Sequence, residues 1–80
     1  MHQPPTFEVD GTAIRQERMQ AGLEISELAE LAGISRRYLS HLENGTRTRM
    51  RPSRYAALRK ALKASATRLL APPRPPENKE

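Results

Sequence analysis

Apolar residues recur three or four positions apart in several separate stretches, the spacing that places side chains on one face of a helix. The clearest case is residues 25–32, where the apolar positions are Ile25, Leu28, Ala29 and Ala32. The same spacing predicts a first helix that runs to about Gln20, a third over residues 36–43, and a fourth that begins at Pro52. We expect a fifth, short helix that carries Leu69 and Leu70, and we find no strand pattern or repeat.

Residues suited to helix ends separate these stretches. Candidate N-caps are Asp10 or Thr12, Ser35 and Ser65, and candidate stops are Gly22, Gly33, Asn44-Gly45 and Pro72-Pro73. The pattern predicts an all-α fold, a compact bundle of five helices. Only Gly33, Ile34 and Ser35 separate the second helix from the third, which forces the pair to cross steeply and indicates a helix-turn-helix.

The ends of the chain differ from its middle. Proline pairs near both ends oppose helix and sheet, so we expect a flexible arm at 1–9, a folded domain at 10–71 and a disordered proline-rich tail at 72–80. Cysteine is absent, which excludes disulfides and thiolate metal sites. No apolar run suits a membrane span and the opening residues do not resemble a signal peptide, so we expect a cytoplasmic protein.

The net charge of +5 is unevenly distributed. Residues 1–34 carry two basic and six acidic side chains, whereas residues 35–70 carry ten basic side chains and Glu43 as the only acid. A concentrated positive field attracts polyanions. Nucleic acid is therefore the leading partner, ahead of an acidic membrane surface.

Arg18 breaks the pattern of the first helix because it lies four residues after Ile14, on the face that should be buried. A buried guanidinium requires a carboxylate, since an unpaired buried charge is very costly. Glu43 lies on the inward side of the third helix, four residues after Leu39. We predict a structural ion pair between Arg18 and Glu43; the alternative is two separately solvated side chains.

The segments ELAELAGISRRYLSHLENG, IRQERMQAGL and RPSRYAALRKAL resemble the Cro/cI-like (XRE) helix-turn-helix proteins, which include the lambdoid phage repressors and Cro. The resemblance runs from about Ile14 to Leu70. It implies a five-helix bundle of the lambda-repressor type that binds duplex DNA sequence-specifically as a dimer. Members of this family also often pair an arginine of the first helix with the glutamate before Asn-Gly, which matches Arg18 and Glu43.

The resemblance also implies which residues contact DNA. Contacts to base edges fall on the third helix, at Arg36, Arg37, Tyr38, Ser40 and His41. Contacts to the DNA backbone or the minor groove fall on Ser26, Arg47, Arg49, Arg51 and Arg54. The physical reading agrees, because the start of a recognition helix enters the major groove and arginine can donate two hydrogen bonds to guanine. A solvent-exposed His41 without a DNA contact is an equally good interpretation.

Three features of the chain depart from the family pattern. The second helix usually starts with Ser or Thr and then Gln, which hold a phosphate, but this chain has Glu24 and Ile25. A phosphate contact there would depend on backbone amides and Ser26. The loop after the third helix is about two residues longer than in the lambdoid proteins. Lys63 and Ala66 stand where Gly and an apolar residue are usual, so the dimer contact is expected to differ.

The leading functional hypothesis is a transcriptional regulator, a phage-type or prophage repressor or a Cro-like protein, that binds an inverted-repeat operator as a homodimer. One alternative is the antitoxin of a toxin–antitoxin pair, with a protein partner bound through the C-terminal tail. Another is an adaptor that keeps the fold and binds protein instead of DNA. We predict no enzyme, because the chain has no catalytic constellation, and we predict no cofactor, metal site or membrane partner.

Overall fold

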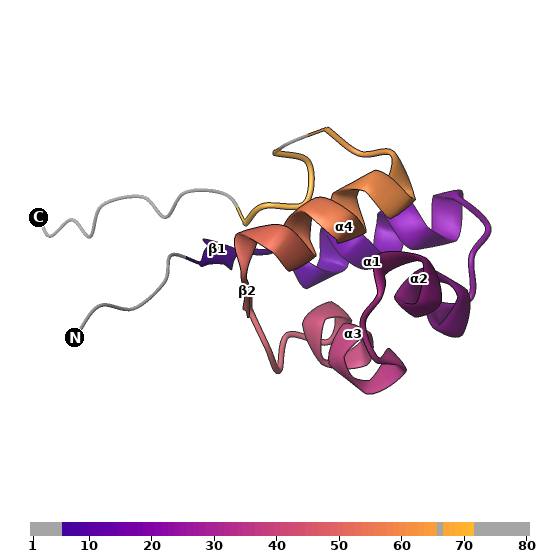
Figure 1. Ribbon diagram of the computed structural model, residues 1–80, viewed down its shortest axis with the longest axis horizontal. Helices are drawn as coiled ribbons and strands as arrows, with labels where there is room; N and C mark the ends of the chain where they lie inside the picture. The colour runs from indigo at the N-terminus through magenta and orange to yellow at the C-terminus, as the bar shows by residue number, and fades with distance from the viewer. Residues whose placement is uncertain (1–5, 66, 72–80) are drawn as a thin grey trace, which may run out of the picture.

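The computed structural model describes residues 6–65 and 67–71 of the chain. In these residues the elements follow the order β1 (Phe7–Glu8), α1 (Gly11–Gln20), α2 (Ile25–Ala32), α3 (Arg36–Glu43), β2 (Arg49–Met50) and α4 (Pro52–Leu62). Figure 1 shows α3 on the side of the bundle away from α4, with α2 between the two. The predicted helix-turn-helix is confirmed as α2 and α3.

The helix ends follow from local chemistry. The Asp10 carboxylate caps α1 by accepting hydrogen bonds from the amides of Thr12 and Ala13, at 3.0 and 3.3 Å. Thr12, the other candidate cap, is therefore inside the helix. Ser35 Oγ accepts from the amide of Tyr38 at 2.9 Å and caps α3. Gly33 ends α2 at a φ of 71°, a left-handed conformation that glycine adopts without a steric penalty.

The core lies between the helices, where α2 contacts both α3 and α4 and α1 contacts α3. Its largest fully buried side chains are Ile14, Leu28, Leu39, Leu42, Met50, Leu58 and Leu69. Leu28, Ala29 and Ala32 of α2 are buried as their spacing predicts, and Ile25 packs at the edge of the core. The helical periodicity thus identified the inward faces correctly.

The described residues contain four helices, so the predicted count of five is wrong. The helix-turn-helix fold class is confirmed. Residues 67–70 form turns, in which the Arg68 amide donates to Ser65 O at 3.3 Å and the Leu70 amide to Thr67 O at 3.2 Å. Leu69 O instead accepts from the amide of Asp10 at 2.8 Å, and Leu70 forms a β-bridge with Val9. These contacts tie the end of the turns to the N-terminal segment, so Leu69 reaches the core without a helix.

The two short strands were not predicted. Phe7–Glu8 pairs antiparallel with Arg49–Met50, so that Phe7 faces Met50 and Glu8 faces Arg49. The Val9 side chain is only 4% exposed. The arm expected at 1–9 is therefore not free over residues 7–9, which belong to the fold; residues 1–5, like the tail expected at 72–80, lie outside the described residues.

Gly11 allows the start of α1 to approach the end of α3. A Cβ atom at this position would overlap the carbonyl oxygen of Leu42 and lie 2.9 Å from that of Glu43. Only a residue without a side chain fits so close to another backbone. The position thus sets how closely α1 and α3 pack. Among the described residues, no helix combines the length and the apolar character that crossing a membrane requires.

Candidate nucleic-acid interface

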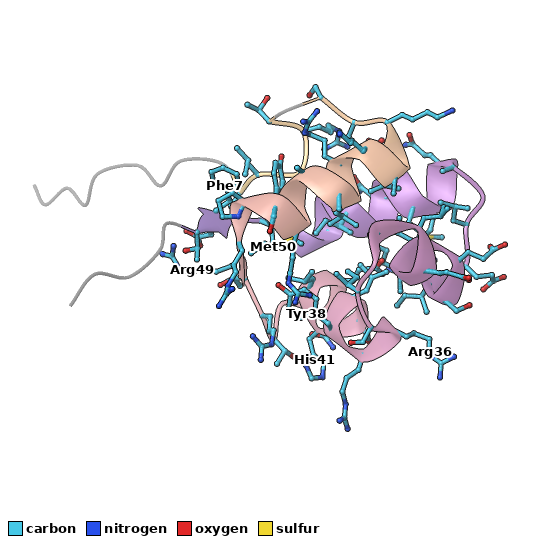
Figure 2. All side chains as sticks on the ribbon, viewed as in Figure 1. Phe7, Arg36, Tyr38, His41, Arg49 and Met50 are labelled. Atoms are coloured by element: carbon cyan, nitrogen blue, oxygen red, sulfur yellow. The ribbon has the colours of Figure 1, made fainter. Side chains whose placement is uncertain are left out.

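The outer face of α3 carries the side chains that the sequence predicts as base contacts. Leu39 and Leu42 are fully buried, which turns the opposite face of the helix outwards. Arg36 and Arg37 at its start are exposed, and Ser40 and His41 are half-buried one turn later. Figure 2 shows Arg36 and His41 at the edge of the molecule that α3 forms. The side chains of Arg36, Arg37, Ser40 and His41 line one open hollow together with Ile25.

The loop after α3 folds back on that helix. Asn44 Oδ1 accepts from the Thr46 amide at 2.9 Å, and the Arg47 amide donates to His41 O at 3.0 Å. Gly45 makes the reversal possible with a φ of 86°. Because of this reversal, the basic loop lies beside the face of α3 that carries His41.

A second hollow brings together the arginines of the loop and of the start of α4, which we call the arginine cluster: Arg47, Arg49, Arg51 and Arg54. Thr6 and Tyr38 also line it, and no acidic side chain among the described residues contributes to it. The guanidinium carbons of Arg47 and Arg54 lie 5.5 and 5.7 Å from the centre of the Tyr38 ring. The negative face of an aromatic ring attracts such cations. The site therefore offers several cationic groups to an anion.

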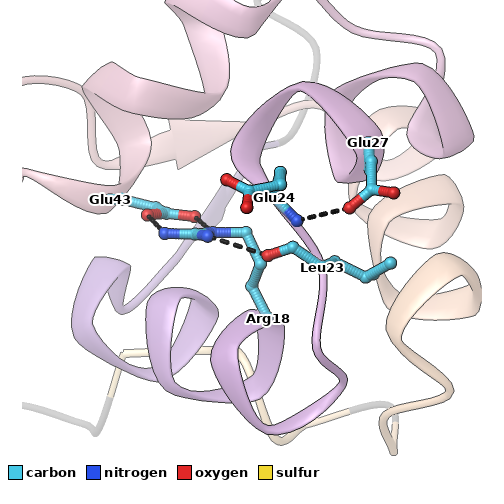
Figure 3. A network of polar contacts seen from close by, with 5 residues as sticks. All are labelled: Arg18, Leu23, Glu24, Glu27 and Glu43. Carbon is cyan, nitrogen blue, oxygen red and sulfur yellow. Dashed lines mark hydrogen bonds and ion pairs between the residues drawn. The ribbon is translucent and has the colours of Figure 1, made fainter.

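The predicted ion pair is present and connects α1 with α3. Arg18 Nε donates to Glu43 Oε2 at 2.7 Å and Arg18 Nη2 donates to Oε1 at 3.0 Å, a two-pronged geometry that Figure 3 shows. The Arg18 and Glu43 side chains are 14% and 7% exposed. Arg18 Nη1 also donates to Leu23 O at 3.0 Å. The hydrogen bond with Glu43 raises the pKa of Arg18 above its ordinary value, and burial opposes this only in part.

The start of α2 is less suited to binding an anion than the same helix end in a family member that has Gln there. The amide of Glu24 is already occupied, because it donates to Glu27 Oε1 at 2.7 Å. The side chains of Glu24 and Glu27 are exposed and add negative charge beside it. Ser26 is exposed at the same end, so its predicted DNA contact stays a prediction. The positive groups of this face lie on α3 and in the arginine cluster.

Sequence reasoning missed the contribution of the N-terminal segment to this surface. Thr6 lines the hollow of the arginine cluster, and its Oγ1 accepts from Arg49 Nη1 at 3.3 Å. The only signal was the alternation of apolar Phe7 and Val9 around polar Glu8, which is too short to predict a strand. Within residues 6–65 and 67–71, no three His, Cys, Asp or Glu side chains gather as metal ligands would.

Comparison with known proteins agrees with this geometry. The family model described as a helix-turn-helix domain matches residues 11–71. The chain belongs to the XRE-like helix-turn-helix family. No curated protein sequence matches it.

Three solved members of this family are similar in structure. SinR of Bacillus subtilis, the master regulator for biofilm formation, was solved in complex with DNA; it is 34% identical, with a TM-score of 0.67 over 70% of this chain and 92% of that one. The restriction-modification controller protein C.AhdI of Aeromonas hydrophila is 31% identical, with a TM-score of 0.64; the match covers 69% of this chain and 82% of that one. The clp gene regulator ClgR of C. glutamicum is 38% identical, with a TM-score of 0.62; the match covers 69% of this chain and 70% of that one.

Proposed function

We propose that this helix-turn-helix protein binds duplex DNA sequence-specifically and regulates transcription. The observation that carries the proposal is the outer face of α3, where Arg36 and Arg37 are exposed at the helix start and His41 follows on the same hollow. The structure of SinR with DNA supports the same partner for this chain. An acidic lipid surface fits less well, because the described residues include no extended apolar face beside the arginines.

The two groups of arginines would contact different parts of the DNA. The start of α3 enters the major groove, where Arg36 or Arg37 donates two hydrogen bonds to guanine O6 and N7, so each half-site contains at least one G·C pair. Ser40, His41 and Tyr38 lie near the same bases. The arginine cluster contacts phosphates, which fix the orientation of the protein without reading sequence. One of its arginines can instead enter the minor groove and sense its width.

The proposed operator is an inverted repeat bound by a homodimer. A two-fold symmetric dimer places its two α3 helices in successive major grooves, about 34 Å or one helical turn apart. A phage-type or prophage repressor or a Cro-like protein has this arrangement. In each case the protein acts in the cytoplasm, on the nucleoid.

Selection from a random duplex library tests the proposal directly. The wild-type protein should enrich an inverted repeat whose half-site centres are separated by about one helical turn. Binding to the enriched duplex should weaken steeply with salt, since each phosphate contact releases counterions. The matched control is the variant with Arg36→Ala and Arg37→Ala, which should bind duplex DNA but enrich no motif. Failure of the wild-type protein to enrich any motif would reject the proposal.

A further inference from the structure

The N-terminal strand β1 lies between two segments that are distant in sequence. On one side the Val9 amide donates to Thr48 O at 2.8 Å, and Glu8 faces Arg49 across the strand pair. On the other side the Ala71 amide donates to Glu8 O at 2.9 Å. The strand therefore connects the basic loop to the end of the folded domain (Figure 1).

Phe7 anchors this strand to α4. Its ring meets the ring of Tyr55 edge to face, with centroids 5.1 Å apart and an interplanar angle of 81°. Tyr55 is 3% exposed and Met50, the partner of Phe7 across the strands, is 1% exposed. Phe7 itself remains 37% exposed, so it covers these buried residues from outside. Loss of its ring would loosen β1 while leaving the helices in contact with one another.

The arginine cluster needs such an anchor because its members repel one another. Its four guanidinium groups come from a stretch of eight residues, and within the part of the chain that the structure describes no acidic side chain lines their hollow. Like charges this close favour a loop that spreads apart. The cluster is held by the Tyr38 ring, by pairing of β2 with β1, and by the contact of Thr6 with Arg49. Two of these three supports come from residues 6–8.

We propose that β1 is part of the DNA-binding surface, where it holds the arginine cluster in position to contact backbone phosphates, and that Phe7 is the positioning residue that fastens it. This rests on the proposed function. A loop that is ordered before it binds loses less conformational entropy when it meets DNA. Phe7 thus contributes to affinity for any duplex without contacting a base.

The test measures Phe7→Ala against wild type on the selected operator and on an unrelated duplex, over a series of salt concentrations. Affinity for both duplexes should fall about tenfold, as expected when a pre-ordered site becomes mobile. The dependence of log affinity on log salt should become shallower by about one phosphate contact. The ratio of the two affinities should not change, because α3 is untouched.

Leu62→Ala is the matched control. Leu62 is buried near the opposite end of α4, eight residues from Arg54, so its loss lowers stability without touching the cluster. Where it remains folded, Leu62→Ala should keep the wild-type salt dependence. If Phe7→Ala does not fold, Phe7→Leu, which keeps an apolar group over Tyr55, should show the same changes at smaller amplitude.

Two results would overturn the inference. One is a folded Phe7 variant with wild-type affinity and salt dependence. The other is a loss confined to the operator with an unchanged salt dependence, because the defect would then lie in base reading. Neither result rejects the proposed function, which fails only if the wild-type protein itself selects no operator.

Discussion

Arg18 donates two hydrogen bonds to the carboxylate of Glu43, which lies 25 residues away in sequence, and both side chains are largely shielded from water. The pair fastens the last turn of α1 to the last residue of α3, the helix that we propose contacts the bases of DNA. Removing one partner leaves the other charge buried without compensation, which costs more than the intact pair contributes.

Arg18→Met and Glu43→Gln should therefore each lower the free energy of unfolding by about 3 kcal/mol. The double variant should lose less than the sum of the two, because it leaves no unpaired charge. Urea unfolding of all four proteins measures this coupling. The control is the more exposed pair Arg68–Glu17, at 2.9 Å with side chains 42% and 21% exposed, where Arg68→Gln should cost about 0.5 kcal/mol. Additive losses at Arg18 and Glu43 would contradict the structural role.

Gly11→Ala should destabilise the protein although the residue is helical. Alanine normally stabilises a helix position by about 0.5–1 kcal/mol relative to glycine. Here the added Cβ meets the carbonyl oxygens of Leu42 and Glu43, which belong to backbone and cannot rotate away. We expect a loss of about 1–3 kcal/mol, typical of overpacking. Thr12→Ala, at the exposed neighbouring position, should change stability by less than about 0.5 kcal/mol in urea unfolding. A stabilised Gly11→Ala would mean that α1 and α3 are less close than described.

Arg36→Ala or Arg37→Ala should reduce the preference for the operator over unrelated duplexes. A lost two-pronged contact to guanine costs about 1–3 kcal/mol at that base pair. Arg51→Ala is the control, since loss of a phosphate contact should weaken all duplexes alike and make the salt dependence shallower by about one contact. Titration of matched and single-mismatch duplexes measures both effects. Equal weakening on all duplexes by the Arg36 and Arg37 variants would place these residues on the DNA backbone instead.

Tyr38→Ala should weaken binding to every duplex, because its ring supports both Arg47 and Arg54. Each such cation–π contact is worth about 0.5–1 kcal/mol at an exposed site, and because both exist before DNA binds, their loss should weaken binding by no more than roughly 5- to 30-fold. Tyr38→Phe keeps the ring and should bind nearly as the wild type does. A changed base preference in either variant would support the direct contact to bases that the resemblance implies.

Stability should fall at alkaline pH because of Tyr55. Burial raises the pKa of its phenol, and a backbone hydrogen bond at Leu69 opposes this only in part. The unfolded chain therefore releases this proton first, from a pH near its ordinary pKa of about 10, and holds fewer protons than the native state. The free energy of unfolding then decreases as pH rises above that value. Comparison of urea midpoints below and above it should show a smaller decrease in Tyr55→Phe; an equal decrease would assign the effect to other groups.

Much of the site could be predicted because its signals are local. The spacing of Leu39 and Leu42 fixes which face of α3 is buried, so it also fixes that Arg36 and Arg37 point outwards. The helix caps at Asp10 and Ser35 can be predicted because each depends on one side chain next to the start of a helix. Arg18 was identifiable because a charge on an apolar face requires a partner, and residues 35–70 contain only Glu43 as acid.

The sequence by itself determined the helices, the short turn of the helix-turn-helix and the charge of the α3 face, since each depends on residues within a few positions of one another. Tertiary structure decided the rest. The pairing of Phe7 with Met50 depends on where a loop more than forty residues away comes to lie, and two-residue strands have no periodicity of their own. The N-terminal segment likewise binds residues 69 and 70 through a hydrogen bond from Asp10 and a β-bridge with Val9, where local preference predicted a helix. The need for glycine at position 11 comes from the backbone of α3 beside it. Neighbouring residues in the sequence do not indicate such a close approach between two helices.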